Sequence, residues 1–158
     1  MTAPKDECLA RVARLRVEMR KHGLDGLVVT DPVHFYWCTG QKVSGGGIGR
    51  PNAFILPLEG EPVVVDWSGP GMFARLYKKP YPTWVEDRRI YPEVPFNHDE
   101  RVDWGIRDAL TDRGLAAGKI GIELGNEPRL ALGILDFERL KTDLPRASWV
   151  NSTPVQCA

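Results

Sequence analysis

The chain has few residues that could perform chemistry on a substrate, and the first candidate is a histidine in an aromatic segment. His34 directly precedes Phe35, Tyr36 and Trp37. A catalytic histidine needs a nucleophile or a carboxylate held close to it, and the sequence identifies no such partner. We therefore expect His34 to have a packing or surface role. Cys38 has no activating neighbour in the sequence and is expected to be a small buried apolar residue.

A glycine-rich stretch at residues 40–50 invites comparison with phosphate-binding loops. Such loops join a strand to the helix that follows, so that the helix N-terminus faces the anion. This stretch follows an expected helix instead. It also lacks the Gly-x-Gly-x-x-Gly register, because the last position is Arg50, and it has no Gly-Lys-Ser/Thr ending. We interpret it as a surface loop, which can still carry function on a rigid scaffold.

A third candidate is the run of His98, Asp99 and Glu100, whose side chains could in principle bind a metal ion. The same residues suit the start of a helix. Asn97 or Asp99 can cap the first turn, and acidic side chains are favourable near the positive end of the helix dipole. We prefer the helix-start interpretation.

Composition narrows the class of protein further. The chain has 158 residues, with 21 Lys+Arg and 21 Asp+Glu, so the formal net charge is zero. One domain is expected from this length. A neutral chain gives no electrostatic case for a nucleic acid or an anionic membrane as partner. No apolar run is long enough to span a bilayer, and the N-terminus is polar, unlike a signal peptide.

The cysteines indicate the redox compartment. Cys8, Cys38 and Cys157 are odd in number and far apart in the sequence. This pattern favours reduced thiols in a cytoplasm over a disulfide framework or a zinc site.

The elements that must position these residues alternate between helical and extended patterns. A helix is expected at 6–22, where apolar residues recur at helical spacing, and Gly23 can end it. A buried strand follows at 27–30. Asp31 can then cap a helix at 32–39. Further along the chain we expect a β-hairpin at 52–67, a helix at 72–79, a strand at 83–91, a helix at 100–113, a strand at 119–124, a helix at 128–144 and a strand at 147–151.

This order predicts an α/β fold with three layers, in which helices cover both faces of a mixed sheet of about six strands. The hairpin makes the sheet mixed rather than all parallel. In the helix at 128–144 the expected buried residues are Leu130, Ile134, Phe137, Leu140 and Leu144. In the strand at 119–124 the expected alternation is Ile120, Ile122 and Leu124.

The order of these elements and several local strings resemble the N-terminal domain of the creatinase, prolidase and aminopeptidase P family. The resemblance extends from about Asp6 to Ser152 and rests on order and spacing together. It implies a ribonuclease H-like fold, with residues 1–158 as a single domain of this type. The strings are Arg11-Val-Ala-Arg-Leu-Arg, Gly23-Leu-Asp-Gly-Leu-Val-Val-Thr-Asp-Pro, Tyr36-Trp-Cys-Thr-Gly, Arg50-Pro-Asn-Ala-Phe-Ile-Leu-Pro, Gly60-Glu-Pro-Val-Val-Val, Lys119-Ile-Gly-Ile-Glu and Ala147-Ser-Trp-Val-Asn-Ser.

In that family a second, pita-bread domain holds two metal ions through aspartates, a histidine and glutamates. No part of this chain matches that ligand set, so the resemblance assigns no catalytic residue, metal ligand or cofactor to it. It implies that the catalytic domain is absent and that two divalent metal ions (Mn, Co or Zn) belong there in peptidase-type relatives. The chain then resembles a domain separated from a metal-dependent hydrolase, or a stand-alone relative.

The resemblance also implies roles in dimerisation and in substrate access. In creatinase-like members the loop before the hairpin reaches toward the neighbouring subunit's active site. The matching positions here are Ile48, Gly49 and Arg50. A guanidinium can form two parallel hydrogen bonds to a carboxylate, so Arg50 is a hypothetical substrate contact. The alternative, that Arg50 only orients the start of the hairpin, stays open.

The expected function is therefore that of a non-catalytic domain in a cytoplasmic hydrolase. The whole enzyme would be either an Xaa-Pro peptidase or a creatinase-like C–N hydrolase. This reading implies a homodimer and contact with a catalytic domain of the same protein, with no nucleic acid and no membrane as partner. Two alternatives are a free-standing protein-interaction module of the same fold and a small nucleotide-binding α/β protein.

Overall fold

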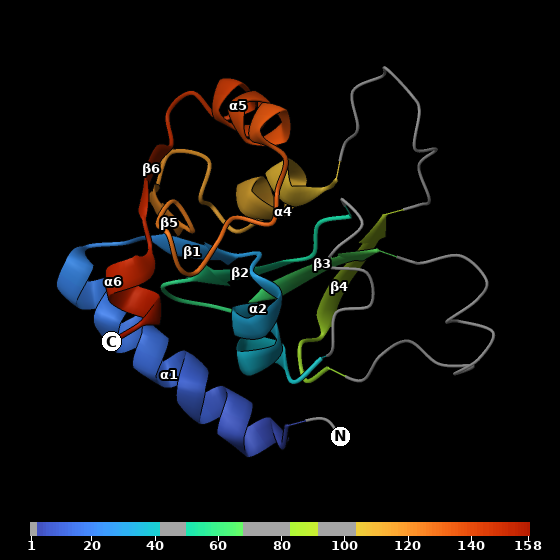
Figure 1. Cartoon of the computed structure of the whole chain (residues 1–158), viewed down its shortest axis with the longest axis vertical. Coiled ribbons are helices and arrows are strands. Elements are labelled where there is room, and N and C mark those ends of the chain that lie inside the picture. The colour runs from blue at the N-terminus through green and yellow to red at the C-terminus, as the bar shows by residue number, and fades with distance from the viewer. Residues whose placement is uncertain (1–2, 42–49, 68–82, 92–103) are drawn as a thin grey trace.

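The computed structural model describes residues 3–41, 50–67, 83–91 and 104–158, which form a six-stranded sheet with helices on both of its faces (Figure 1). In the first part of the chain the elements are α1 (Lys5–His22), β1 (Gly26–Val29), α2 (Pro32–Thr39), β2 (Ala53–Pro57), β3 (Val63–Trp67) and β4 (Asp87–Tyr91). In the second part they are α4 (Ile106–Asp112), β5 (Lys119–Ile122), α5 (Ile134–Asp143), β6 (Ser148–Asn151) and α6 (Thr153–Gln156).

The strands lie in the order β4-β3-β2-β1-β5-β6. β2 is antiparallel to both of its neighbours, β1 and β3, and the remaining pairs are parallel. The carboxyl ends of every strand except β2 therefore lie at one edge of the sheet. We call it the carboxyl edge. It also receives the start of β2.

Local helix-capping signals in the sequence set the boundaries of the first helices, α1 and α2. Gly23 ends α1 in the left-handed conformation at φ 61°, and its N–H reaches the carbonyls of Arg20 and Met19. The Asp31 carboxylate caps α2 by accepting hydrogen bonds from the N–H groups of Val33 (2.9 Å) and His34 (3.2 Å). Both of these predicted helix boundaries are confirmed.

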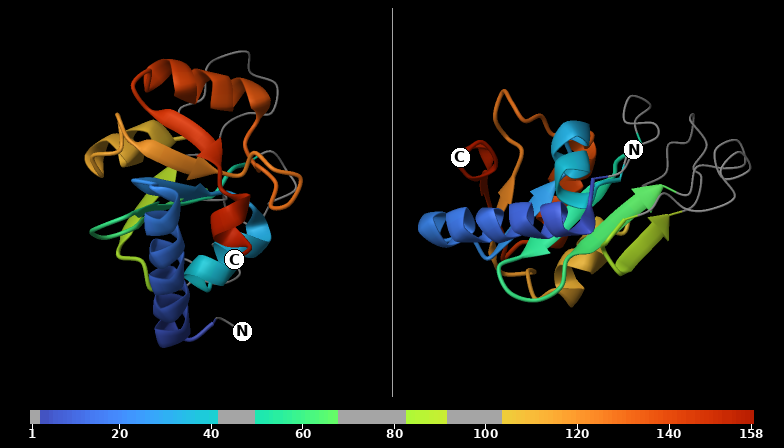
Figure 2. Two further views of the ribbon diagram at one scale, coloured as in Figure 1. Left: turned by 90° about the vertical axis from the view of Figure 1, so that its left-hand side faces the viewer. Right: turned by 90° about the horizontal axis from the view of Figure 1, so that it is seen from below.

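The core consists of two apolar layers, one on each face of the sheet. Because successive strand residues point to opposite faces, Val28 and Ile55 join the cluster beneath α4 and α5, whereas Leu27 and Phe54 join the cluster beneath α1, α2 and α6. Figure 2 shows the same division, with α1, α2 and α6 away from α4 and α5. The predicted α/β/α layering and mixed sheet of six strands are thus confirmed.

Two expectations near β5 were wrong. β5 ends at Ile122, and Leu124 is 44% exposed because the buried side chain at this end of the strand is Glu123. The helix expected from Pro128 begins only at Ile134, whose side chain is 79% exposed. The residues between are held at the carboxyl edge by a hydrogen bond from the Ala131 N–H, so they do not take up helical pairing.

Other boundaries also differ from expectation. α4 begins at Ile106, because Gly105 adopts a left-handed conformation at φ 76° and cannot continue a helix from before it. The short helix α6 was not predicted. β4 covers only the end of the expected strand at 83–91. The expected helix at 72–79 and the first residues of the one at 100–113 lie outside the described residues.

Candidate functional site at the carboxyl edge

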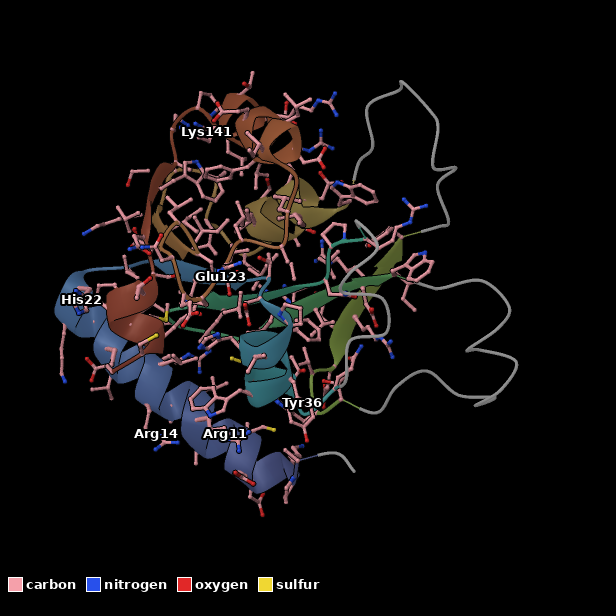
Figure 3. All side chains as sticks on the ribbon, viewed as in Figure 1. Arg11, Arg14, His22, Tyr36, Glu123 and Lys141 are labelled. Atoms are coloured by element: carbon pink, nitrogen blue, oxygen red, sulfur yellow. The ribbon has the colours of Figure 1, made fainter. Side chains whose placement is uncertain are left out.

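A buried glutamate organises one half of the carboxyl edge. Glu123 follows β5 and is 1% exposed. Its carboxylate accepts hydrogen bonds from the Thr30 N–H (2.7 Å), from the Asp31 N–H (2.9 and 3.0 Å to its two oxygens) and from the Thr30 hydroxyl (2.5 Å). One side chain thus joins the end of β5 to the turn between β1 and α2. Figure 3 labels Glu123 beside the sheet.

The two carboxyl groups of this half have opposite pKa shifts. Burial raises the pKa of Glu123 to about 7, although the hydrogen bonds from Thr30 and Asp31 work in the other direction. Burial also opposes ionisation of Asp31. There, however, the backbone N–H groups of His34, Val33 and Arg129 together outweigh it and lower the pKa of the carboxyl. Near neutral pH, Asp31 is therefore ionised while Glu123 is close to its midpoint.

His34 has a carboxylate partner that the sequence analysis did not assign. Its Nδ1 lies 3.4 Å from Oδ1 of Asp31, the residue that caps the same helix. The signal was present, because a cap residue and the third residue after it lie side by side at a helix start. The described residues contain no group of three His, Cys, Asp or Glu side chains that could hold a metal ion. We therefore assign no metal-dependent step to them.

The other half of the carboxyl edge contains the predicted site residue Arg50. Arg50 is only 6% exposed, and its guanidinium lies 5.9 Å from the centre of the Trp67 ring. This distance is within the range of a cation–π contact. Ile48 and Gly49, the other two predicted site residues, lie outside the described residues, as do His98, Asp99 and Glu100.

The same half of the carboxyl edge contains a buried polar cluster that was not predicted from the sequence. The Asp66 carboxylate, at the end of β3, accepts a hydrogen bond from Gln41 Nε2 (2.6 Å) and forms an ion pair with Arg88 on β4. Asn52, two residues after Arg50, accepts a hydrogen bond from the Trp67 N–H at 3.5 Å. These contacts join β3 to β4 and hold the residues before β2 against the end of β3. These contacts could not be predicted from the sequence, in which Asp66 only marks the end of an apolar run.

The cysteines do not form a reactive site in the structure. All three are free thiols, and Cys8 and Cys38 are buried. Burial is the main cause that raises the pKa of both buried thiols, so they stay protonated. The prediction that Cys38 is a small buried residue is confirmed.

A cavity of about 220 Å³ lies between α1, α2 and α6. Trp37 forms one wall, and Arg11 and Arg14 lie over its ring at 5.2 and 5.7 Å. Figure 3 labels these two arginines on α1. Leu15 and Val155 provide apolar lining. Arg50, the predicted site residue that the structure describes, does not line this cavity.

The strands and helices define a layered α/β domain with a polar carboxyl edge. None of its described helices is long and apolar enough to cross a bilayer. Residues 11–156 match the Creatinase/Prolidase N-terminal domain, and the chain belongs to that family.

Some of the relatives are much longer proteins. The chain is 31% identical over 152 residues to ectoine hydrolase from Halomonas elongata, covering 94% of this chain and 36% of that protein. The dipeptidase PepE from Mycobacterium ulcerans matches with a TM-score of 0.67 at 18% identity, over 98% of this chain and 37% of that one. The chain thus spans little more than a third of each.

A solved structure of comparable extent also matches. It is the creatinase/prolidase N-terminal domain of an X-Pro dipeptidase from Streptococcus pyogenes, with a TM-score of 0.62 and 20% identity. The match covers 94% of this chain and 98% of that structure. At this identity the similarity establishes the fold alone.

Proposed function

We propose that residues 1–158 form one non-catalytic N-terminal domain of a metal-dependent hydrolase, and that this domain serves dimerisation and substrate access. The observation that carries the proposal is the family match over residues 11–156, combined with the partial coverage of longer hydrolases. The catalytic pita-bread domain, with two divalent metal ions, belongs to the remainder of such a protein. The described residues of this chain do not offer a metal site of their own.

Two substrate classes fit the proposal: Xaa-Pro peptides and the substrates of a creatinase-like C–N hydrolase. The two structural neighbours described above are named as dipeptidases, but at 18–20% identity they are evidence for the fold alone. The curated relative at 31% identity is a hydrolase named for ectoine rather than for a peptide. We therefore keep the C–N hydrolase beside the Xaa-Pro peptidase.

Arg50 is the residue through which substrate access would be controlled. Its guanidinium lies at the carboxyl edge, packed over Trp67. A guanidinium can form two parallel hydrogen bonds to a carboxylate, so a substrate carboxylate is a ligand of matching geometry. Contact would be made with the active site of a neighbouring subunit, which requires a homodimer.

The compartment proposed for the protein is the cytoplasm. The observation in support is that Cys8, Cys38 and Cys157 are all free thiols, as expected for a reducing environment.

Metal-supplemented activity assays test whether catalysis belongs to the pita-bread domain rather than to residues 1–158. Residues 1–158 should show no turnover of Xaa-Pro dipeptides or creatine with Mn²⁺ or Co²⁺, whereas the same assay on the protein extended by a pita-bread domain should show turnover of one class. Turnover by residues 1–158 alone would overturn the proposal. Light scattering on the extended protein should give the mass of a dimer.

A further inference from the structure

Four residues at the carboxyl edge form what we call the clasp: Glu123, Thr30, Asp31 and Ala131. The Thr30 hydroxyl donates to Glu123 Oε2 at 2.5 Å and accepts from the Ala131 N–H at 2.9 Å. Through this hydroxyl, the Glu123 carboxyl group also holds the segment 124–133, which connects β5 to α5. Apolar side chains stand exposed at both ends of that region, namely Leu124, Ile134 and Leu135.

The clasp gives Glu123 hydrogen bonds but no charge partner. Within the described chain, its hydrogen bonds come from Thr30 and Asp31, and all of these donors are uncharged. Among the described residues, the charged group that shifts the pKa of Glu123 is the Asp31 carboxylate, which opposes its ionisation. An ionised Glu123 is therefore a buried second negative charge, which is costly without a cation.

In the part of the chain that the structure describes, the other titratable groups around the clasp do not supply that cation. His34, at the start of α2, faces Asp31 with its Nδ1. The thiol of Cys38, also on α2, stays protonated because burial raises its pKa. The Arg129 side chain of segment 124–133 donates its Nε–H to the Asn126 carbonyl. α6, which follows β6, contains no Asp, Glu, His, Lys or Arg.

We propose that the clasp is a proton-linked switch: it holds segment 124–133 against the start of α2 when Glu123 is neutral, and loss of the Glu123 proton weakens that hold. The 2.5 Å contact joins Thr30 Oγ1 and Glu123 Oε2, and its hydrogen can belong to either oxygen. The hydrogen bond therefore persists when the Glu123 carboxyl group is neutral. Opening of the segment gives an ionised Glu123 access to water. Ionisation and opening therefore favour one another.

The raised pKa of Glu123, about 7, places this switch near neutral pH. The closed segment binds the proton more tightly than the open one, so the opening equilibrium shifts toward the open form as the pH rises. Between about pH 5 and pH 8 the shift amounts to roughly ten- to a hundredfold.

Amide NMR of the complete chain tests the switch directly. The chemical shifts of the Thr30, Asp31 and Ala131 amides should titrate together with a midpoint near 7. The hydrogen-exchange protection factor of Ala131, corrected for intrinsic exchange, should fall by roughly ten- to a hundredfold from about pH 5 to pH 8. Glu123→Gln, which cannot ionise, should abolish both pH dependences.

Glu127→Gln is the matched control, because Glu127 lies in the same segment but is exposed. It should leave the midpoint and the protection change as in the parent chain. A parent midpoint below about 5, an Ala131 protection factor that does not change, or the same titration in Glu123→Gln would each overturn the proposal. If Glu123→Gln does not fold, the proposal is still tested by the amide titration and the Ala131 protection factor of the parent chain and of Glu127→Gln.

Discussion

Glu123 and Thr30 are 93 residues apart in the chain, yet their side chains meet at 2.5 Å in the interior of the carboxyl edge. The contact joins the end of β5 to the end of β1, two parallel neighbours in the sheet. It therefore fixes the relative position of the β1–α2 turn and the segment that follows β5. A single carboxyl group holds these parts of the edge together.

Replacing Glu123 with Ala should lower the free energy of unfolding by about 2–4 kcal/mol. The substitution leaves the buried N–H and hydroxyl groups of Thr30, and the partly buried Asp31 N–H, without their acceptor. Urea unfolding followed by circular dichroism measures the change. Glu127→Ala, at an exposed position of the same segment, should stay within about 0.5 kcal/mol of the parent chain. Equal effects of the two variants would show that the carboxylate does not hold the edge.

The stability that Glu123 contributes should fall as the pH rises. Its folded pKa, about 7, lies above the usual value of 4.5, so the folded chain binds the proton more tightly than the unfolded chain. The contribution is complete below about pH 4.5 and is lost as the pH rises through 7, by up to about 3 kcal/mol. This contribution is isolated by the difference in unfolding free energy between the parent chain and Glu123→Gln. The difference is measured by urea unfolding below about pH 4.5 and again above pH 7. A difference that grows with rising pH would have the wrong sign.

The Asp31 cap should behave in the opposite way. Its pKa is lowered in the folded chain, so its contribution is present above the usual value of 3.8 and is lost as the pH falls through the folded value. Asp31→Ala should cost about 1–2 kcal/mol at neutral pH, and Asp31→Asn should recover most of the loss because Asn also caps helices. Thermal unfolding of the two variants checks this order. An Asn variant as unstable as the Ala variant would contradict the capping role.

Arg50 should affect catalysis in the extended protein more than it affects folding. If it binds a substrate carboxylate, Arg50→Ala should lower kcat/KM by roughly ten- to a hundredfold, the loss of a charge-assisted hydrogen bond. Steady-state kinetics with substrates that carry or lack the carboxylate provide the readout. Arg146→Ala, at an exposed position, is the control. Loss of stability with unchanged kcat/KM would instead favour a role in orienting the hairpin.

Local signals made much of the fold predictable from the sequence. Gly23 and Asp31 mark helix boundaries through their own backbone preferences, and the hairpin at 52–67 follows from two apolar runs with a glycine between them. Layering follows from the alternation of these elements. In each case the interacting groups lie within a few residues of one another, so a short window contains the whole signal.

The clasp was beyond such reasoning because its partners are distant in the sequence. Nothing near Glu123 indicates that its carboxylate turns inward to Thr30, and the alternation of Ile120 and Ile122 continues naturally to Leu124. Ile134 was misplaced for a related reason. Helical spacing alone extends the helix back to Pro128, whereas Ala131 is bound to Thr30 across the edge. Arg50 was identified from the family resemblance, but its contact with Trp67 required the structure.

The most direct test of the proposed function is the nucleotide sequence of the gene beyond the codon for Ala158. The proposal predicts an open reading frame that continues into a pita-bread domain, with two aspartates, a histidine and two glutamates as metal ligands. A stop codon directly after Ala158 would contradict it. The chain would then be a free-standing member of its family, and its function would have to be sought in a binding partner.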